Sequence, residues 1–150
     1  GTVVGAPGTE TITNTELLHL PVDVLVPAAL ADAINESTAS GIRAKIVVEG
    51  ANAPTTPAGD AIINDKGLVV VPDILANSGG VIVSYFEWVQ NRLGYKWTAD
   101  RVNRRSDRIM KDAFDNVYQA SIKYDVPMRI AAYIVAIDKV AQTYTYRGGY

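Results

Sequence analysis

The sequence predicts an α/β fold in which a parallel βαβαβ unit is followed by C-terminal helices. Three short β-rich runs begin roughly 23 residues apart, which is the length of a strand, a short helix and two loops. Each run is almost continuously apolar and β-branched, which is typical of parallel strands covered on both faces. After residue 79 the apolar residues recur at helical spacing. The three predicted strands are residues 22–26, 44–48 and 68–71.

Helix signals stand before and between these strands. Thr13 and Glu16 have the spacing of a capping box, so we expect a short helix before the first strand. Residues 35–40 fit a short helical turn between the first and second strands. Thr56 precedes Pro57, and this pair is typical of an N-cap followed by the first helical residue. The sequence therefore predicts a helix in each connection of the sheet.

Two long helices follow the sheet. Thr98 begins the first, and Asp125 and Pro127 separate it from the second, which ends near Arg147. Each helix has an apolar stripe that we expect to lie in the core. The first stripe is Val102, Ile109, Ala113, Val117 and Ala120, and the second is Ile130, Ile134, Ile137, Ala141 and Tyr144.

The composition excludes several classes of function. A chain of 150 residues with 48% hydrophobic and 20% charged residues fits one globular domain with a real core. The net charge is −2 and no block of Lys and Arg occurs, so neither nucleic acid nor a membrane is an expected partner. The absence of cysteine excludes disulfides and thiolate sites, and with a single histidine we predict no metal site. No signal peptide or membrane span is recognisable, so the expected location is cytoplasmic.

Small residues follow each predicted strand. The three loops are residues 27–29, 49–56 and 72–80. Because ligands of such sheets bind beyond the carboxyl ends of the strands, these loops are the candidate site. Small side chains let a ligand approach the backbone, and Asn52 and Asn77 each bring a donor and an acceptor to this edge. The pattern favours a nucleotide or nicotinamide site.

A polar stripe interrupts the apolar run after the third strand. Its residues are Asn77, Val81, Ser84 and Trp88, whose spacing would place them on one helical face. One interpretation is a ligand-facing stripe. The other is local: Ser84 would bond a carbonyl four residues back, and Asn77 would cap the helix that begins near Gly79. Spacing alone leaves both open.

The remaining polar candidates have no catalytic arrangement. Asp73 and Glu87 are acids without a base or nucleophile beside them, so we interpret them as caps or members of ion pairs. His19 lies between two leucines and far from the loops in sequence, so we interpret it as structural. We therefore predict no catalytic residue within this chain.

Several long motifs resemble one family. The stretches VDVLVPAAL, AKIVVEGANAPTTPAGDAI and VVPDILANSGGVIVSYFEWVQN, with the closing helices, are similar to the C-terminal part of glutamate dehydrogenases, in the Glu/Leu/Phe/Val dehydrogenase family. The likeness covers essentially all of the chain. It implies that residues 1–78 are the second half of an NAD(P)-binding Rossmann domain. Residues 79–150 would be a C-terminal helical segment that packs on it and lines the cleft.

The resemblance also implies roles for individual residues. In the family, the positions of Asn77, Val81 and Ser84 bind the substrate glutamate, and the Ser hydroxyl reaches its side-chain carboxylate. Ser84 therefore implies an acidic substrate, whereas relatives that act on leucine, valine or phenylalanine tend to have an apolar residue at this position. The positions implied to bind the cofactor, NAD or NADP, are Ala28, Ala29, Gly50 and Asn52.

The chain also departs from the family pattern. Ala53 stands where Gly is usual and Ser78 where Ala is usual. No G-x-G-x-x-G motif occurs, and the family's catalytic Lys and Asp belong to an N-terminal domain without a counterpart here. The implied parent activity is the reversible oxidative deamination of L-glutamate to 2-oxoglutarate and ammonia, and we expect this chain alone to be inactive.

Two alternatives remain at this point. One is a non-catalytic half-Rossmann module that binds a nucleotide or another protein, and the other is part of a leucine, phenylalanine or valine dehydrogenase. A half sheet leaves one strand edge without a neighbour. We therefore expect a homo-oligomer, or association with the missing N-terminal part.

Overall fold

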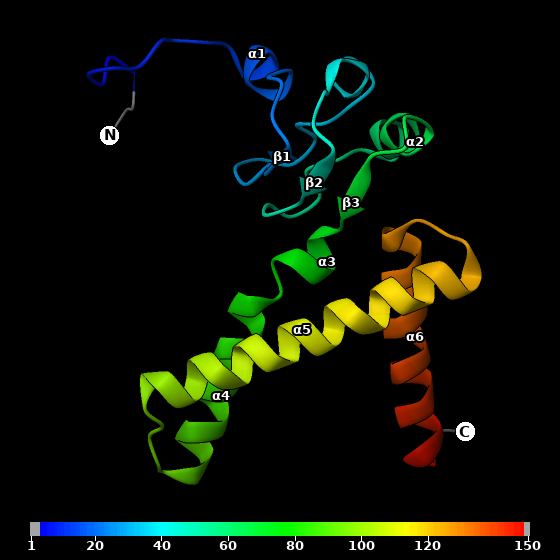
Figure 1. Ribbon diagram of the computed structural model, residues 1–150. Coiled ribbons are helices and arrows are strands. Elements are labelled where there is room, and N and C mark those ends of the chain that lie inside the picture. Colours follow the sequence, from blue (N-terminus) through cyan, green and yellow to red (C-terminus); the bar gives the residue numbers. More distant parts are fainter. Residues whose placement is uncertain (1–3, 149–150) are drawn as a thin grey trace.

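The computed structural model describes residues 4–148 and confirms an α/β architecture (Figure 1). A small parallel sheet is followed by a helical segment. In chain order the elements are α1 (Asn14–Leu18), β1 (Val24–Leu25), the 3-10 helix η1 (Ala39–Gly41), β2 (Ile46–Val48), α2 (Pro57–Asp65), β3 (Val69–Val71), α3 (Asp73–Ala76), α4 (Gly79–Leu93), α5 (Ala99–Tyr124) and α6 (Met128–Tyr146).

The sheet has the predicted strands in the predicted parallel arrangement. Across residues 4–148, three strands pair in the order β1-β2-β3. Val47 of the central strand lies opposite Leu25 on one side and Val70 on the other. The strands are shorter than predicted. At β1 the Asp23 carbonyl accepts from the backbone N–H groups of both Lys45 and Ile46, which ends the regular ladder.

The short helical turn expected between β1 and β2 is a turn followed by the 3-10 helix η1, so this connection contains no regular α-helix. Side-chain hydrogen bonds to the backbone account for the difference. The Asn35 side-chain oxygen accepts from the Ser37 N–H, and the Thr38 hydroxyl accepts from the Asn35 N–H and donates to the Ala33 carbonyl. Such bonds offer the backbone an alternative to a helix.

The predicted helix caps are present. Thr13 and Glu16 form a capping box at α1, in which each side chain accepts from the other residue's backbone N–H. Thr56 caps α2 by accepting from the Gly59 N–H, and Pro57 takes the first helical position. Thr98 likewise caps α5, whereas α5 ends at Asp125 in a left-handed conformation.

Two apolar cores hold the structure together. One joins the sheet to α1, α2 and η1, and its fully buried members include Ile34, Val47 and Ile63. The other joins α3, α5 and the first turns of α6. Its buried residues are Leu75, Val117, Ala120, Met128, Ala131 and Ala132.

The predicted core stripes are only partly buried. Val117 and Ala120 of the first stripe lie in the core, but Ile109 is exposed. The second stripe is wrong, because Ile137 and Tyr144 are 64% and 60% exposed. The start of α6 instead packs against α5 through its alanines, whose small side chains allow the two helices to approach closely.

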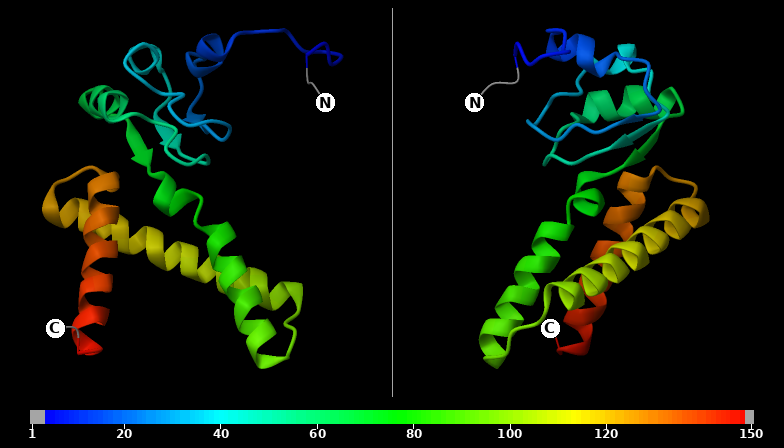
Figure 2. Two further views of the ribbon diagram at one scale, coloured as in Figure 1. Left: turned by 180° about the vertical axis from the view of Figure 1, so that it is seen from behind. Right: turned by 60° about the vertical axis from the view of Figure 1, so that its left-hand side comes forward.

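The helices α4, α5 and α6 extend away from one end of the sheet (Figures 1 and 2). α3 and the start of α6 connect this helical segment to the end of β3. In the part of the chain from residue 4 to 148, no helix is both long and apolar enough to cross a membrane.

Candidate functional site

The loop after β2 forms the centre of the candidate site. The backbone N–H groups of Gly50 and Ala51 both donate to the Pro27 carbonyl, at 3.0 and 2.9 Å. These bonds place the loop after β2 directly beside the loop after β1. A side chain at position 50 would lie 3.0 Å from the Ala28 Cβ, so only Gly permits this approach without a shift. The structure therefore brings Gly50 and Ala28 together at one edge of the sheet.

The two asparagines predicted to share this edge are hydrogen-bonded to each other. The Asn77 Nδ2 donates to the Asn52 Oδ1 at 2.8 Å and to the Ala51 carbonyl at 3.3 Å. Asn77 is the C-cap residue that follows the short helix α3, and Ser78 is the N-cap residue of α4. Asn77 therefore does not cap α4, and the capping interpretation of this residue is wrong.

The single helical face predicted for Asn77, Val81 and Ser84 is also wrong, because a helix boundary separates the first of them from the other two. Val81 and Ser84 both lie on α4 and are exposed, with Val81 at 74%. They still share a face of that helix by their spacing. Glu87 is likewise exposed on α4.

Ala28 and Ala29 line a cavity of about 520 Å³ between the loop after β1 and α1. Leu17 and Leu18 of α1 form its apolar side, and Asp32 is among its polar residues. Ala29 thus faces the same region as Ala28. It is exposed, as are Ala28 and Asn52, so small side chains line this rim of the loops.

Ala53 has a backbone conformation that favours glycine. Its φ angle is 46°, in the left-handed region that other residues rarely adopt. Two hydrogen bonds hold it there: the Ala53 N–H donates to the Asp73 Oδ2 at 2.8 Å, and its carbonyl accepts from the Asp32 N–H at 3.0 Å. This conformation accounts for the glycine that the family pattern has at this position. In this chain the loop has the same conformation with Ala53.

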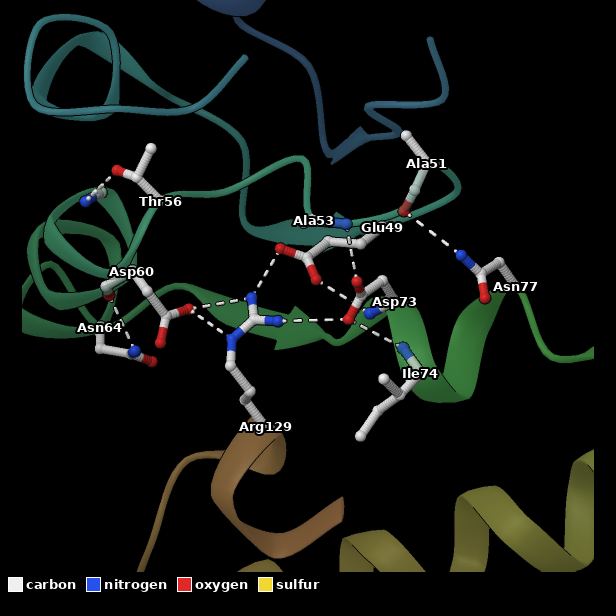
Figure 3. A network of polar contacts seen from close by, with 11 residues as sticks. Glu49, Ala51, Ala53, Thr56, Asp60, Asn64, Asp73, Ile74, Asn77 and Arg129 are labelled. Atoms are coloured by element: carbon white, nitrogen blue, oxygen red, sulfur yellow. Dashed lines mark hydrogen bonds and ion pairs between the residues drawn. The ribbon is translucent and has the colours of Figure 1, made fainter. Parts of the chain in front are cut away.

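A buried ion-pair network lies directly behind the loop, and we call Arg129, Glu49, Asp60 and Asp73 the arginine cluster (Figure 3). The Arg129 Nη2 is 2.6 Å from the Glu49 Oε1 and 3.0 Å from the Asp60 Oδ1. Its Nη1 is 3.5 Å from the Asp73 Oδ1. One guanidinium of α6 therefore joins the end of β2, the first turn of α2 and the start of α3.

The arginine cluster is shielded from water. The Glu49 side chain is fully buried, and that of Arg129 is 17% exposed. Burial opposes the charge of Arg129, but hydrogen bonds to Glu49 and Asp60 outweigh it and raise its pKa above the ordinary value. Arg129 is therefore a cation throughout the neutral pH range.

The interpretation of Asp73 as an ion-pair member is confirmed, but Arg129 and Glu49 were missed. Glu49 follows an apolar run directly, and Arg129 interrupts the apolar start of a helix, which are the two signals that sequence offers. His19 has the structural position expected of it. Its Nε2 lies 2.9 Å from the Thr38 carbonyl, and its ring fills the space beside Gly41.

The rim of these loops is open to a flat group. Their rim is built from small exposed residues, so a ring can approach the backbone. The Asn52 oxygen already accepts from Asn77, which leaves the Asn52 amide nitrogen as the side-chain donor for a ligand. The guanidinium of the arginine cluster is occupied by three carboxylates, and the cluster meets this loop through the Asp73 Oδ2, which accepts from the Ala53 N–H.

The family model that describes Glutamate/Leucine/Phenylalanine/Valine dehydrogenase matches residues 2–148. The chain is 56% identical over 150 residues to a glutamate dehydrogenase of Thermotoga maritima, covering 100% of the chain and 36% of that protein. It is 49% identical over 139 residues to an NAD-specific glutamate dehydrogenase of Staphylococcus aureus, covering 93% of the chain and 34% of that protein. The chain thus spans about a third of the length of these relatives.

The fold has a solved counterpart. The structure resembles a hetero-hexameric glutamate dehydrogenase of Thermus thermophilus in its leucine-bound form, with a TM-score of 0.88 and 30% sequence identity. The match covers 98% of this chain and 35% of that one. The parallel sheet and the C-terminal helices therefore have the arrangement of this enzyme's corresponding third.

Proposed function

Because the chain belongs to the Glutamate/Leucine/Phenylalanine/Valine dehydrogenase family, we propose that it is the C-terminal third of an NAD(P)-dependent glutamate dehydrogenase. The parent enzyme would catalyse the reversible oxidative deamination of L-glutamate to 2-oxoglutarate and ammonia. The observation that carries this proposal is the hydrogen bond between Asn52 and Asn77, which joins the loop expected to hold cofactor to the loop expected to hold substrate.

The proposed cofactor is NAD, in line with the NAD-specific relative, and NADP is the alternative to be tested. The nicotinamide ring supplies hydride transfer when bound. The chain's own residues bind and orient it: Ala28, Ala29 and Gly50 allow close approach, and the Asn52 amide donates a hydrogen bond. Proton transfer is assigned to the catalytic Lys and Asp of the family's N-terminal domain, so these 150 residues alone would be inactive.

The proposed substrate residues are Asn77, Val81 and Ser84. Ser84 is exposed on α4, where its hydroxyl can donate to the side-chain carboxylate of glutamate. A hydroxyl that faces the methyl groups of leucine or valine would lose its hydrogen bonds to water without replacement. Glutamate is therefore favoured over the apolar amino acids on which other family members act.

In this proposal, residues 1–78 form the cofactor half of a Rossmann domain and residues 79–150 the helical segment that lines the cleft. The expected location is the cytoplasm, since a chain without cysteine fits a reducing compartment. The parent enzyme is expected to be a homo-oligomer. On its own the chain should self-associate at tens of micromolar in light scattering, and a monodisperse monomer would contradict this expectation.

The test is a rebuilt enzyme in which these 150 residues replace the matching region of the Thermotoga maritima glutamate dehydrogenase. We expect glutamate-dependent reduction of NAD by the rebuilt enzyme and none by the 150-residue chain. A rebuilt enzyme that has the oligomeric state and circular dichroism of the Thermotoga enzyme, but no activity, would contradict the proposal. It would favour the non-catalytic half-Rossmann module.

Substrate choice is tested in the same rebuilt enzyme with Ser84→Val. We expect the ratio of kcat/KM for glutamate to that for leucine to fall by about tenfold or more, because one hydrogen bond to a charged group is lost. Glu87→Gln, an exposed change on the same helix, is the control and should leave the ratio unchanged. An unchanged ratio in Ser84→Val would remove Ser84 from the substrate site.

A further inference from the structure

We propose that Arg129 is a positioning residue for residues 50–53, which we call the cofactor loop. It would act through Asp73 on the backbone of Ala53. The inference rests on the proposed function, because it concerns the loop in which Asn52 lies. The hydrogen bonds and ion pairs of the Arg129 side chain go to Glu49, Asp60 and Asp73, not to Asn52. Its influence follows from a chain of hydrogen bonds that begins at its guanidinium and ends at the Ala53 N–H.

Asp73 is the middle of this chain, because its two carboxylate oxygens have different partners. Oδ1 accepts from the Ile74 N–H at 2.8 Å and lies 3.5 Å from the Arg129 Nη1. Oδ2 accepts from the Ala53 N–H at 2.8 Å. A rotation of this carboxylate would therefore break the bond to the cofactor loop. The guanidinium on the opposite side restricts that rotation.

Glu49 bonds to both Arg129 and Asp73 and so links them a second time. Its Oε1 is 2.6 Å from the Arg129 Nη2, and its Oε2 accepts from the Asp73 N–H at 2.9 Å (Figure 3). The planar guanidinium can serve both carboxylates because it presents several N–H donors in fixed directions. Arg129 thus fixes the position of the Asp73 backbone as well as that of its side chain.

The cofactor loop needs this support because Ala53 has a φ angle of 46°. A non-glycine residue in the left-handed region persists only where surrounding contacts impose it. The Asp73 carboxylate is one of the two hydrogen-bond partners that do so, with the Asp32 N–H as the other. Asn52 precedes Ala53 directly, so a relaxed Ala53 backbone would move the amide that is proposed to meet the cofactor.

Asp60 provides a matched control within the same cluster. Its Oδ1 lies 3.1 Å from the Arg129 Nε and 3.0 Å from the Nη2, so it shares the guanidinium with Glu49 and Asp73. Its side chain is 19% exposed, close to the 15% of Asp73. Asp60 lies on α2, and its carboxylate bonds to Arg129 rather than to the loop of residues 50–53. A change at Asp60 therefore weakens the ion pairs without touching the link to Ala53.

The experiment compares Asp73→Asn, Arg129→Lys and Asp60→Asn in the rebuilt enzyme, with KM for NAD, KM for glutamate and kcat as readouts. We expect Asp73→Asn and Arg129→Lys to raise KM for NAD by about tenfold, the effect of one charge-assisted hydrogen bond, and to change kcat by less than about twofold. Lys keeps the charge but cannot bridge three carboxylates. Asp60→Asn should lower Tm while KM for NAD stays within about twofold.

Equal effects of Asp60→Asn and Asp73→Asn on KM for NAD would overturn the proposal, since they would show a general loss of stability. Unchanged KM for NAD in both Asp73→Asn and Arg129→Lys would also overturn it. If Asp73→Asn does not fold, Arg129→Lys against Asp60→Asn decides the question. An inactive, well-folded parent would contradict the proposed function instead, so the two failures are distinct.

Discussion

The loops at the sheet edge and the helices α4, α5 and α6 differ in how many of their groups have partners within the chain. Several backbone and side-chain groups of the loops bond within the chain, through Pro27, Asn77 and the arginine cluster, while the buried Thr55 hydroxyl has no hydrogen-bond partner. The helices instead leave large apolar side chains exposed: Val81, Val140 and Ile137 are exposed by 74%, 70% and 64%. The loops are therefore held mainly by hydrogen bonds within the chain, whereas the helices present apolar surface that favours burial against further protein.

This difference shows which part of the site the chain can determine by itself. The loop of residues 50–53, for which we propose a cofactor role, is held by directional hydrogen bonds to Pro27, Asp73 and Asn77. The orientation of Ser84 on α4 depends on a helix that joins the sheet through α3 and the start of α6. We therefore expect changes around the loops to have large effects on stability, and changes on the exposed helices to have small ones.

The largest effect is expected for Arg129→Met. Met has a similar length but leaves three carboxylates without their cation, of which Glu49 is fully buried. Removal of one partner from a buried charge cluster costs about 3–5 kcal/mol of unfolding free energy. Urea unfolding of the rebuilt enzyme measures it. Arg104→Met is the control, because its pair with Asp100 is exposed and should contribute under about 0.5 kcal/mol.

If both arginine changes lower stability equally, the contrast between the two regions is false. Equal and small losses would mean that the arginine cluster adds nothing beyond a surface pair. Equal and large losses would mean that α5 depends on its exposed charges as strongly as the sheet edge depends on its buried ones.

Two glycines, Gly59 and Gly80, test the same difference between the two regions through packing instead of charge. A Cβ at Gly59 of α2 would lie 2.6 Å from the Ile34 carbonyl oxygen, so Gly59→Ala must displace backbone and should destabilise by about 1–3 kcal/mol. A Cβ at Gly80 of α4 meets nothing within 4 Å. Gly80→Ala should therefore stabilise, by up to about 0.5–1 kcal/mol, through helix propensity. In thermal unfolding, a lower Tm for Gly59→Ala and a higher Tm for Gly80→Ala would confirm the prediction. A shift of both Tm values in the same direction would contradict it.

Much of the fold was predictable from local signals. The caps at Thr13, Thr56 and Thr98 and the three parallel strands follow from residue types at short spacing. The exposure of the stripe with Ile137 and Tyr144 was not predictable, because periodicity shows that a helix face is apolar but not which element covers it. The turn after β1 is 3-10 rather than α-helical for a local reason, since side-chain hydrogen bonds at Asn35 and Thr38 compete with a regular α-helix there.

For the site, the edge of the sheet was predictable and the cluster behind it was not. Asn52 and Asn77 follow two parallel strands, so topology alone brings them together. Arg129 meets Glu49 across 80 positions of sequence, and no local spacing encodes a contact of that range. Val81 and Ser84 lie on α4 as expected, but their roles with substrate stay predictions.

A smaller effect is expected for Ala53→Gly. Because Ala53 has a φ angle of 46°, Gly should relieve about 1 kcal/mol of backbone strain and raise the free energy of unfolding. Asp125→Gly is the matched change in the helical segment, with a φ angle of 51° at the end of α5. Both should stabilise in urea unfolding. A loss of stability in Ala53→Gly would show that the greater conformational entropy of Gly in the unfolded chain outweighs the relieved strain.

The smallest effect concerns the pH dependence of α1. Hydrogen bonds from the backbone N–H and the hydroxyl of Thr13 lower the pKa of Glu16 below its ordinary value of 4.5. A lowered pKa in the folded state means that the capping box stabilises α1 above pH 4.5 and that this contribution is lost as the pH falls through the folded value. NMR amide shifts of α1 between neutral pH and acid should therefore show fraying. Glu16→Gln is the control, because Gln can accept the same bonds but does not titrate. Fraying that persists unchanged in Glu16→Gln would assign it to another carboxylate.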